Sequence, residues 1–165
     1  MKAVVQRVKN ASVSVDGKIT GRIDRGLLVY LGVAAGDSEK EADWTAEKTV
    51  NLRIFDDDSG KMNLSLSEFA QSLESGPPAE GSGKCGVLAV SQFTLLADAR
   101  KGRRPSYGKA AAPELAKPLY EYFIKKIRSY GLVCEEGVFK ARMELTYTND
   151  GPVTILLDTE LASVL

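Results

Sequence analysis

The chain has 165 residues, and its 22 basic and 22 acidic side chains leave no net charge, so any attraction to nucleic acid has to come from a local patch. The sequence contains no histidine, which excludes Ser-His-Asp and Cys-His catalysis and argues against zinc hydrolysis. If the protein is a hydrolase, its base is a carboxylate, a lysine, a tyrosine or the substrate itself.

Nothing in the sequence indicates a membrane or secreted protein. No apolar run approaches the roughly 20 residues that a membrane helix needs. The stretch MKAVVQRVKN mixes charged with apolar residues, unlike a signal peptide. Cys85 and Cys134 are too few for a disulfide scaffold. We therefore expect a cytoplasmic protein without membrane contact, folded as a single domain over residues 1–165.

The first part of the chain predicts strands. Residues 2–8 and 11–15 alternate in part between apolar and polar side chains, as strands do. Asp16-Gly17 is typical of a hairpin turn and leads into KITGRI. GLLVYLGVA, residues 26–34, is a near-continuous apolar run, which predicts a strand buried on both faces.

A helix and a polar turn come next. Ser38 and Glu41 form a capping box at the start of a helix. Ala42, Ala46, Thr49 and Val50 fall on one face of this helix. FDDDSG, residues 55–60, has some of the acidic residues of a calcium loop, but its glycine and its closing glutamate are not at the required positions. We interpret it as a polar turn.

The second half predicts a loop, a strand, a helix and further strands. ESGPPAEGSGKCG (74–86) has the composition of a surface loop and precedes the strand CGVLAVSQFTLL. A helix follows, with Pro113 in its first turn, Pro118 as a kink or a delayed start, and Gly131 as its stop. Further strand candidates are residues 132–139, 141–148 and 153–159.

The order of these elements indicates the fold class. Strands and helices do not alternate regularly, so a doubly wound parallel sheet is not expected. We predict a single α+β domain, with a curved, mostly antiparallel, barrel-like sheet and two main helices packed outside it.

Three stretches have residue types that can carry chemistry. Ser91-Gln92-Phe93-Thr94 closes an apolar strand, where polar side chains and backbone N–H groups can stabilise an oxyanion. Ser91 or Thr94 would need an activating base to act as a nucleophile. The alternative is that these polar side chains only satisfy backbone groups.

The second stretch is RKGRRPSYGK, residues 100–109, where five basic residues surround Tyr107. Such a patch suits phosphates, and the tyrosine can stack on a base. A solvated basic loop explains the same residues equally well. The third stretch, Asn149 to Thr154, contains Gly151-Pro152 and by itself indicates a turn between two strands.

Together these stretches resemble a known family. SQFTL (91–95) and NDGPVT (149–154), in this order, are similar to the paired signatures of D-aminoacyl-tRNA deacylases. MKAVVQRV, GLLVYLGV, RIF with GKMN (53–63) and RRPS fit the same pattern, so the resemblance covers nearly the whole chain. The departure is ESGPPAEGSGKC, which is longer than in compact members and leaves the local fold of that loop open.

The resemblance implies a homodimer with an α+β, barrel-like fold. Its members cleave the ester between a D-amino acid and the 3′-terminal adenosine of tRNA. Gly151-Pro152 would be cis and reach into the partner's site, with Arg7 behind it. There it would collide with an L side chain, whereas a glycyl group, which has none, would enter.

The resemblance also implies a mechanism without a cofactor or a metal. The 2′-OH of the terminal ribose takes part in hydrolysis. Residues 91–94 form the catalytic stretch: backbone N–H groups near Ser91 and Phe93 polarise the ester carbonyl, Gln92 positions the substrate, and Thr94 is not required as a nucleophile. Phe139 and Met143 match the adenosine pocket, and tRNA phosphates would contact four basic residues, Arg100, Lys101, Arg103 and Arg104.

Three alternatives stay open at this point. One is the related animal-type tRNA deacylases, which share the fold but have a trans Gly-Pro and a different first motif; the intact SQFTL argues against them. Another is a non-catalytic RNA- or DNA-binding module that uses residues 100–109. The third is a purely structural dimer.

Overall fold

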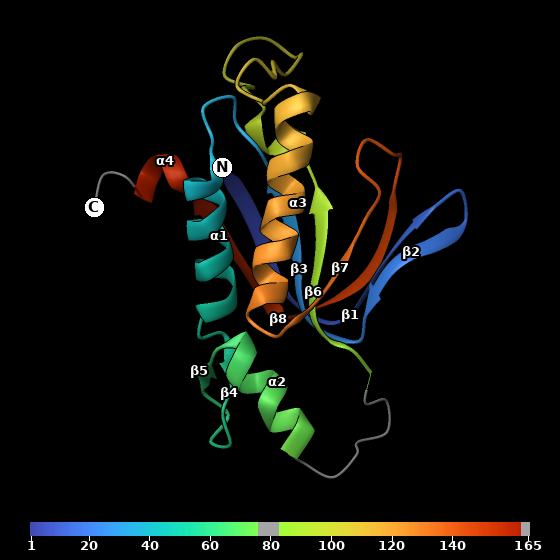
Figure 1. Ribbon diagram of the computed structural model, residues 1–165, viewed down its shortest axis with the longest axis vertical. Coiled ribbons are helices and arrows are strands. Elements are labelled where there is room, and N and C mark those ends of the chain that lie inside the picture. Colours follow the sequence, from blue (N-terminus) through green and yellow to red (C-terminus); the bar gives the residue numbers. More distant parts are fainter. Residues whose placement is uncertain (76–82, 163–165) are drawn as a thin grey trace.

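The computed structural model describes residues 1–75 and 83–162, which form one curled main sheet with helices against it (Figure 1). The main sheet has the order β2-β1-β3-β6-β7, and β8 also pairs with β1. Its strands are β1 (Lys2–Val15), β2 (Lys18–Ile23), β3 (Arg25–Gly32), β6 (Cys85–Ser91), β7 (Val133–Glu136) and β8 (Glu144–Asp158). The other elements are the short strands β4 (Phe55–Asp56) and β5 (Met62–Leu64), the helices α1 (Glu39–Asn51), α2 (Leu66–Ser75), α3 (Pro113–Ser129) and α4 (Thr159–Ala162), and a 3₁₀ turn, η1 (Phe93–Leu96).

The pairing confirms the predicted fold class. β1 is antiparallel to β2, β3 and β8, and the β4–β5 pair is antiparallel as well. Only the pairs β3–β6 and β6–β7 are parallel within the described strands. The long strands β1 and β8 bend together, so the sheet curls into a half-barrel (Figure 1).

Alternation along the central strands buries both faces of this sheet. Leu27 and Val29 of β3 pack in the larger core, which includes the helices, whereas Leu28 between them packs in a second core. β6 divides in the same way between Val87 and Leu88. The near-continuous apolar run of β3 was therefore correctly interpreted as a strand buried on both faces.

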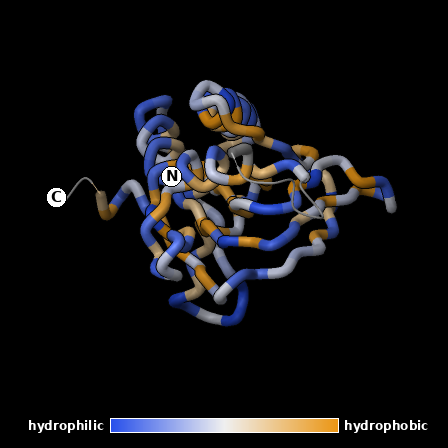
Figure 2. Tube along the Cα trace, turned by 90° about the horizontal axis from the view of Figure 1, so that it is seen from below, coloured by the Kyte–Doolittle hydropathy of each residue, from blue (hydrophilic) through white to orange (hydrophobic). Residues whose placement is uncertain are grey.

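The two main helices cover one face of the sheet. α1 and α3 lie side by side over it, and Figure 2 shows them end on. The Ser38–Glu41 capping box of α1 is present, and Pro113 begins α3 as expected. Pro118 lies inside α3 and does not delay its start. In the described part of the chain, no helix has the length and apolar composition needed to cross a membrane.

The sequence prediction missed the one-turn helix α4 and the longer helix α2. α2 spans only ten residues, and it begins with a second capping box. The N–H of Ser65 donates to Glu68 Oε2 at 2.7 Å, and the N–H of Glu68 donates to Ser65 Oγ at 3.3 Å. The spacing of a serine and a glutamate three residues later was the available signal. Most of the predicted loop at 74–86 falls on residues 76–82, which lie outside the described residues.

The strand prediction for the C-terminal third also needs correction. Residues 141–148 and 153–159 are not two strands but parts of one 15-residue strand, β8, which continues through Gly151 and Pro152. The chain keeps its direction because β8 pairs with β1 on both sides of this point. The candidate at 132–139 shortens to the four residues of β7.

The acidic stretch after β4 is a polar turn. Asp57 Oδ1 accepts hydrogen bonds from the N–H groups of Ser59 at 2.9 Å and Lys61 at 3.2 Å, and these bonds close the turn between β4 and β5. Across the described residues, no three or more His, Cys, Asp or Glu side chains gather in a way that could hold a metal ion.

Candidate active site

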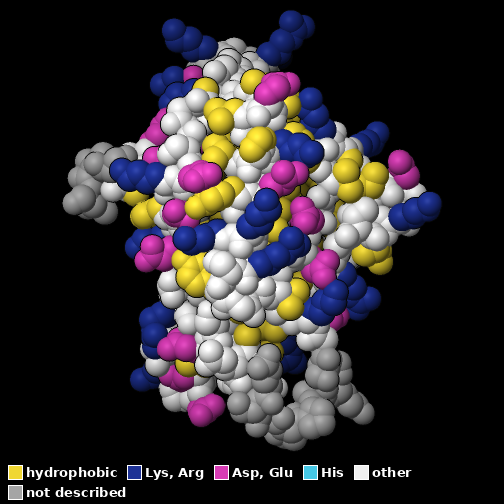
Figure 3. All heavy atoms as spheres, viewed as in Figure 1, with side chains coloured by type: hydrophobic (Ala, Val, Ile, Leu, Met, Phe, Trp, Pro, Cys, Tyr) yellow, Lys and Arg dark blue, Asp and Glu magenta, His cyan; other side chains and the backbone are white. Residues whose placement is uncertain are grey.

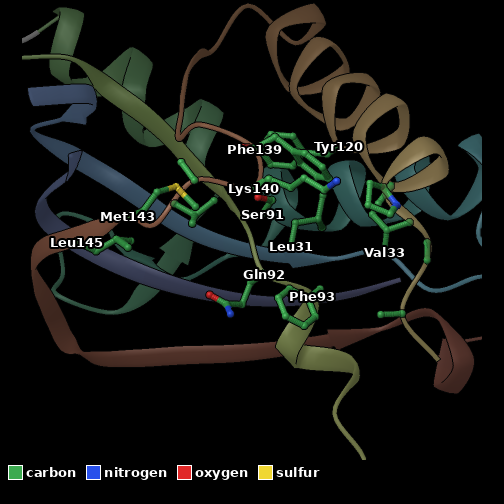
Figure 4. Close-up of a pocket in the computed structure, with 16 residues that line it drawn as sticks. Leu31, Val33, Ser91, Gln92, Phe93, Tyr120, Phe139, Lys140, Met143 and Leu145 are labelled. Carbon is green, nitrogen blue, oxygen red and sulfur yellow. The ribbon is translucent and has the colours of Figure 1, made fainter. Parts of the chain in front are cut away.

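A largely apolar cavity of about 490 Å³ opens where the parallel strands β3 and β6 end (Figure 4). Both strands run in the same direction, so their carboxyl ends meet at one edge of the sheet, a common place for ligand sites. The chain segments that surround the cavity are the ends of β3 and β6, the start of α3 and the β7–β8 connection. Its lining residues are Leu31, Val33, Val90, Ser91, Gln92, Phe93, Ala110, Ala111, Pro113, Ala116, Tyr120, Phe139, Lys140, Ala141, Met143 and Leu145.

The end of β6 brings three of the predicted site residues to the cavity. β6 ends at Ser91, and the N–H of Gln92 donates to Leu31 O at 2.8 Å, which ties the turn to β3. Phe93 begins η1 with 58% of its surface exposed. Thr94 does not line the cavity; its hydroxyl accepts a hydrogen bond from Gln92 Nε2.

The opposite wall contains the two residues expected to line an adenosine pocket, Phe139 and Met143. The Phe139 ring lies 6.1 Å from that of Tyr120, at a tilt of 41°. A Cβ at Gly137 would lie 2.5 Å from Met143 Sδ, so the glycine permits the methionine to approach. Five of the predicted residues, from segments far apart in the sequence, therefore share one cavity.

The cavity offers binding groups but no base. Among its lining residues within the described chain, the titratable side chains are Tyr120 and Lys140. Burial, followed by the charge of Glu136, raises the pKa of Tyr120 far above its usual value, and its hydroxyl donates to Ala89 O at 2.8 Å. The Lys140 ammonium is a hydrogen-bond donor without acceptor capacity. Sequence reasoning missed both residues, although Tyr120 lies in the predicted helix between Pro113 and Gly131.

The NDGPVT stretch forms a bulge in β8 that lies apart from this cavity. Gln6 pairs with Thr154 and Val8 pairs with Asn149, so residues 150–153 of β8 stand opposite the single residue Arg7 of β1. Gly151 has φ +119°, a conformation that side-chain-bearing residues rarely adopt. The Gly151–Pro152 peptide bond is cis, as the resemblance implied, and both residues are exposed.

Side chains of the motif close the base of this bulge. Asn149 Oδ1 accepts from the N–H of Val153 at 3.2 Å, and Asn149 Nδ2 donates to Thr154 Oγ1 at 3.1 Å. Gln6 Nε2 of β1 donates to the same threonine oxygen at 3.2 Å. The exposed Gly-Pro pair therefore stands on a base of three hydrogen bonds.

Arg7 lies behind the bulge, and its side chain is buried. Its Nη1 donates to Ile54 O at 2.6 Å, and its Nε lies 3.4 Å from Asp150 Oδ2. A Cβ at Gly151 would lie 3.3 Å from Arg7 Nη2. Neither Gly151 nor Pro152 lines the cavity of the same chain, so one chain keeps the bulge and the cavity separate.

The basic loop lies near the mouth of the cavity. Asp98 and Ser106 join its two ends through backbone hydrogen bonds of 2.7 and 2.9 Å, and the Tyr107 ring packs edge-on to Phe93 at 5.1 Å. Hydrogen bonds from Arg100 hold the pKa of Asp98 well below its usual value. Figure 3 shows basic side chains projecting from the end of the molecule where Figure 1 draws this loop.

Arg100 is thus engaged with Asp98 at 2.6 Å, which makes it less available to a ligand than the other predicted contacts. Lys101, Arg103 and Arg104 are exposed, and no carboxylate among the described residues forms an ion pair with them.

Comparison with known proteins identifies the family. The family model described as D-Tyr-tRNA(Tyr) deacylase matches residues 4–158. Proteins named D-aminoacyl-tRNA deacylase from Koribacter versatilis and Fervidobacterium nodosum are each 54% identical over 160 residues, covering 97% of this chain and 98% of the relative. The chain therefore belongs to the D-aminoacyl-tRNA deacylase family.

Two solved structures share the fold. One is named c-Myc DNA Unwinding Element Binding Protein; it is 38% identical, has a TM-score of 0.82, and the match covers 96% of this chain and 98% of that one. The other is a probable eukaryotic D-amino acid tRNA deacylase, 17% identical, with a TM-score of 0.74 over 94% of this chain and 97% of that one. The second likeness concerns the fold alone.

Proposed function

We propose that this protein is a cytoplasmic editing enzyme that hydrolyses the ester of D-aminoacyl-tRNA to free amino acid and tRNA. The observation that carries this proposal is the presence, in a chain matched to the family over residues 4–158, of two features: the cavity lined by Ser91, Gln92 and Phe93, and the bulge that exposes Gly151 and Pro152. In the proposed complex, the terminal adenosine lies against Phe139 and Met143, and the ester lies beside Ser91 and Phe93.

The reaction uses the 2′-OH of the terminal ribose in place of a protein nucleophile. Support for this comes from the absence of histidine and from a cavity whose titratable lining residues, among those described, are Tyr120 and Lys140. Gln92 positions the substrate, and backbone N–H groups near Ser91 and Phe93 polarise the carbonyl. The N–H of Gln92 itself is committed to Leu31 O.

Selection against L-amino acids comes from Gly151 and Pro152 of a second subunit. Their backbone carbonyls face the substrate α-amino group, so that a D side chain points away and an L side chain collides. The exposure of the pair, its hydrogen-bonded base and its separation from the cavity of its own chain support this role. Because glycine has no side chain to collide, glycyl-tRNA is also a substrate.

The proposed dimer needs a surface that brings one bulge to the other cavity, and β8 offers one. Among the described strands, β8 pairs only with β1, so its other edge exposes unpaired backbone groups. Leu156 on this strand is 64% exposed, and Tyr147 is 37% exposed. An edge strand with exposed apolar side chains is suited to association with a second chain.

The basic loop holds tRNA phosphates next to the cavity. The Phe93–Tyr107 contact links the loop to the proposed ester site. The main phosphate contacts are Lys101, Arg103 and Arg104. Arg100 has to break its ion pair with Asp98 before it can bind a phosphate.

A second candidate function is nucleic-acid binding without catalysis. It is favoured by the name of the 38% identical structure, which describes a protein that binds a DNA element. The same basic loop would serve it. The apolar cavity of about 490 Å³ beside the loop has no part in phosphate binding, so we prefer the enzyme.

Side-by-side hydrolysis assays test the proposed activity. We expect the protein to deacylate D-tyrosyl-tRNA and glycyl-tRNA and to leave L-tyrosyl-tRNA and L-alanyl-tRNA intact. The measurement is the release of the free amino acid from each tRNA. If no substrate is hydrolysed but the protein still binds tRNA, the result would favour the binding module. Cleavage of L-alanyl-tRNA would favour the animal-type deacylases.

Removal of the terminal 2′-OH tests the mechanism. With D-tyrosyl-tRNA that ends in 2′-deoxyadenosine, we expect single-turnover hydrolysis to fall by about 100-fold or more, the scale of a lost catalytic group. Thr94→Ala should keep most of its activity on the ordinary substrate. Full turnover of the 2′-deoxy substrate would reject the proposed role of the ribose.

Neutralising the basic loop tests its contact with phosphates. In Arg103→Gln/Arg104→Gln, the slope of log affinity against log salt concentration should flatten by roughly 0.7–0.9 for each lost contact. The control is Lys18→Gln/Lys61→Gln, which removes two exposed charges from the start of β2 and from the β4–β5 turn. Equal slopes in the two double variants would mean that the loop is only a solvated surface.

Sedimentation tests the dimer. The molar mass from sedimentation should be twice the 17.8 kDa of one chain. Leu156→Glu should shift it toward single chains and reduce hydrolysis, because a charge would enter the β8 contact. Ile19→Glu changes a side chain that is 62% exposed at the β1–β2 hairpin and serves as the control. A fully active single chain would contradict the shared site.

A further inference from the structure

Arg7 is held from two sides by carboxylates of different segments. Its Nη1 lies 3.3 Å from Asp56 Oδ1 of β4, and its Nε lies 3.4 Å from Asp150 Oδ2 of β8. Nη1 also donates to Ile54 O at 2.6 Å, whereas Nε is buried and has no hydrogen-bond partner among the described residues. The guanidinium orientation therefore depends on the β4 segment as much as on the bulge.

β4 is a firm support for this contact. Phe55, next to Asp56, is 3% exposed, and its ring stacks on that of Phe69 in α2 at 4.5 Å and 13°. The bonds to Asp57 close the turn that follows. Asp56 is thus presented to Arg7 by a packed backbone, even though half of its own side chain, 51%, is exposed.

Asp150 has a second cation within reach. Lys9 Nζ lies 3.7 Å from Asp150 Oδ1, on the carboxylate that Arg7 also contacts. Asp150 immediately precedes Gly151, and Arg7 Nη2 lies 3.3 Å from the place of a Cβ on that glycine. Without a carboxylate at position 56, the guanidinium is drawn toward Asp150 alone, and the balance among Arg7, Lys9 and Asp150 shifts next to the Gly-Pro pair.

We propose that Asp56 is a positioning residue for stereochemical selection, which acts by holding the Arg7 guanidinium behind Gly151 and Pro152. This inference rests on the proposed function of that pair as a wall against L side chains. A guanidinium fixed from β4 resists the backward displacement of the bulge that an L side chain requires. Asp56 itself touches no substrate, so its effect is on selectivity rather than on the chemical step.

The test compares Asp56→Asn with Asp58→Asn. The control removes the same charge from an exposed aspartate two residues further along the turn. The readouts are the ratio of kcat/KM for D-tyrosyl-tRNA to that for L-tyrosyl-tRNA, and the ratio of Kd for the non-hydrolysable L-tyrosyl amide of 3′-amino-3′-deoxyadenosine to Kd for its D-tyrosyl counterpart. We expect Asp56→Asn to lower both ratios by about 5-fold, the scale of a partly exposed ion pair, and Asp58→Asn to leave them unchanged.

Further measurements separate positioning from general damage. Asp56→Glu, which keeps the carboxylate, should retain more of both ratios than Asp56→Asn, and the thermal midpoints of Asp56→Asn and Asp58→Asn should agree. If the wild-type protein discriminates between the two substrates and Asp56→Asn has the same two ratios, the inference about Asp56 is wrong, whereas the proposed function stands. A wild-type protein that hydrolyses neither substrate overturns the proposed function and the inference with it.

Discussion

The pairing of β1 with its neighbours is the constraint on which the rest of the structure depends. β1 pairs with β8 along nearly its whole length, and on its other edge it pairs first with β3 and then with β2. Through β3 it fixes β6, whose end carries Ser91 to Phe93 into the cavity. Through β8 it fixes the bulge, because the register places four residues opposite Arg7. One strand therefore sets the positions of both functional elements.

In the proposed function, the cavity serves for binding and the bulge for selection. The cavity is lined mainly by apolar residues and presents the polar end of β6, which suits recognition of a nucleoside with a reactive ester nearby. The bulge presents a glycine and a proline on hydrogen bonds from Asn149 and Gln6. This division fits an enzyme whose reactive hydroxyl belongs to the substrate. Such a protein has to bind the substrate and discriminate between D- and L-amino acids, but it does not need a nucleophile of its own.

Local signals in the sequence predicted much of this fold, and tertiary contacts account for the remainder. The Ser38–Glu41 box and the apolar run of β3 act within a few residues, so they could be recognised directly. The sequence prediction divided β8 into two strands, because a proline normally marks the end of a strand. In the structure, Pro152, which has no N–H to donate, lies in the bulge and the strand continues past it. The Asp56–Arg7 contact joins residues 49 positions apart, and no spacing rule indicates it.

The hydrogen bonds of Asn149 also explain why so short a signature is informative. The Asn149 side-chain amide forms hydrogen bonds with Val153 and Thr154. The motif that forms the bulge therefore also contains both partners of the hydrogen bonds that shape it. Two hydrogen bonds at the base of the bulge thus lie within these six consecutive residues, and Gln6, Arg7 and Lys9 of β1 supply further contacts. NDGPVT therefore encodes part of the bulge, and the pairing of β8 with β1 supplies the rest.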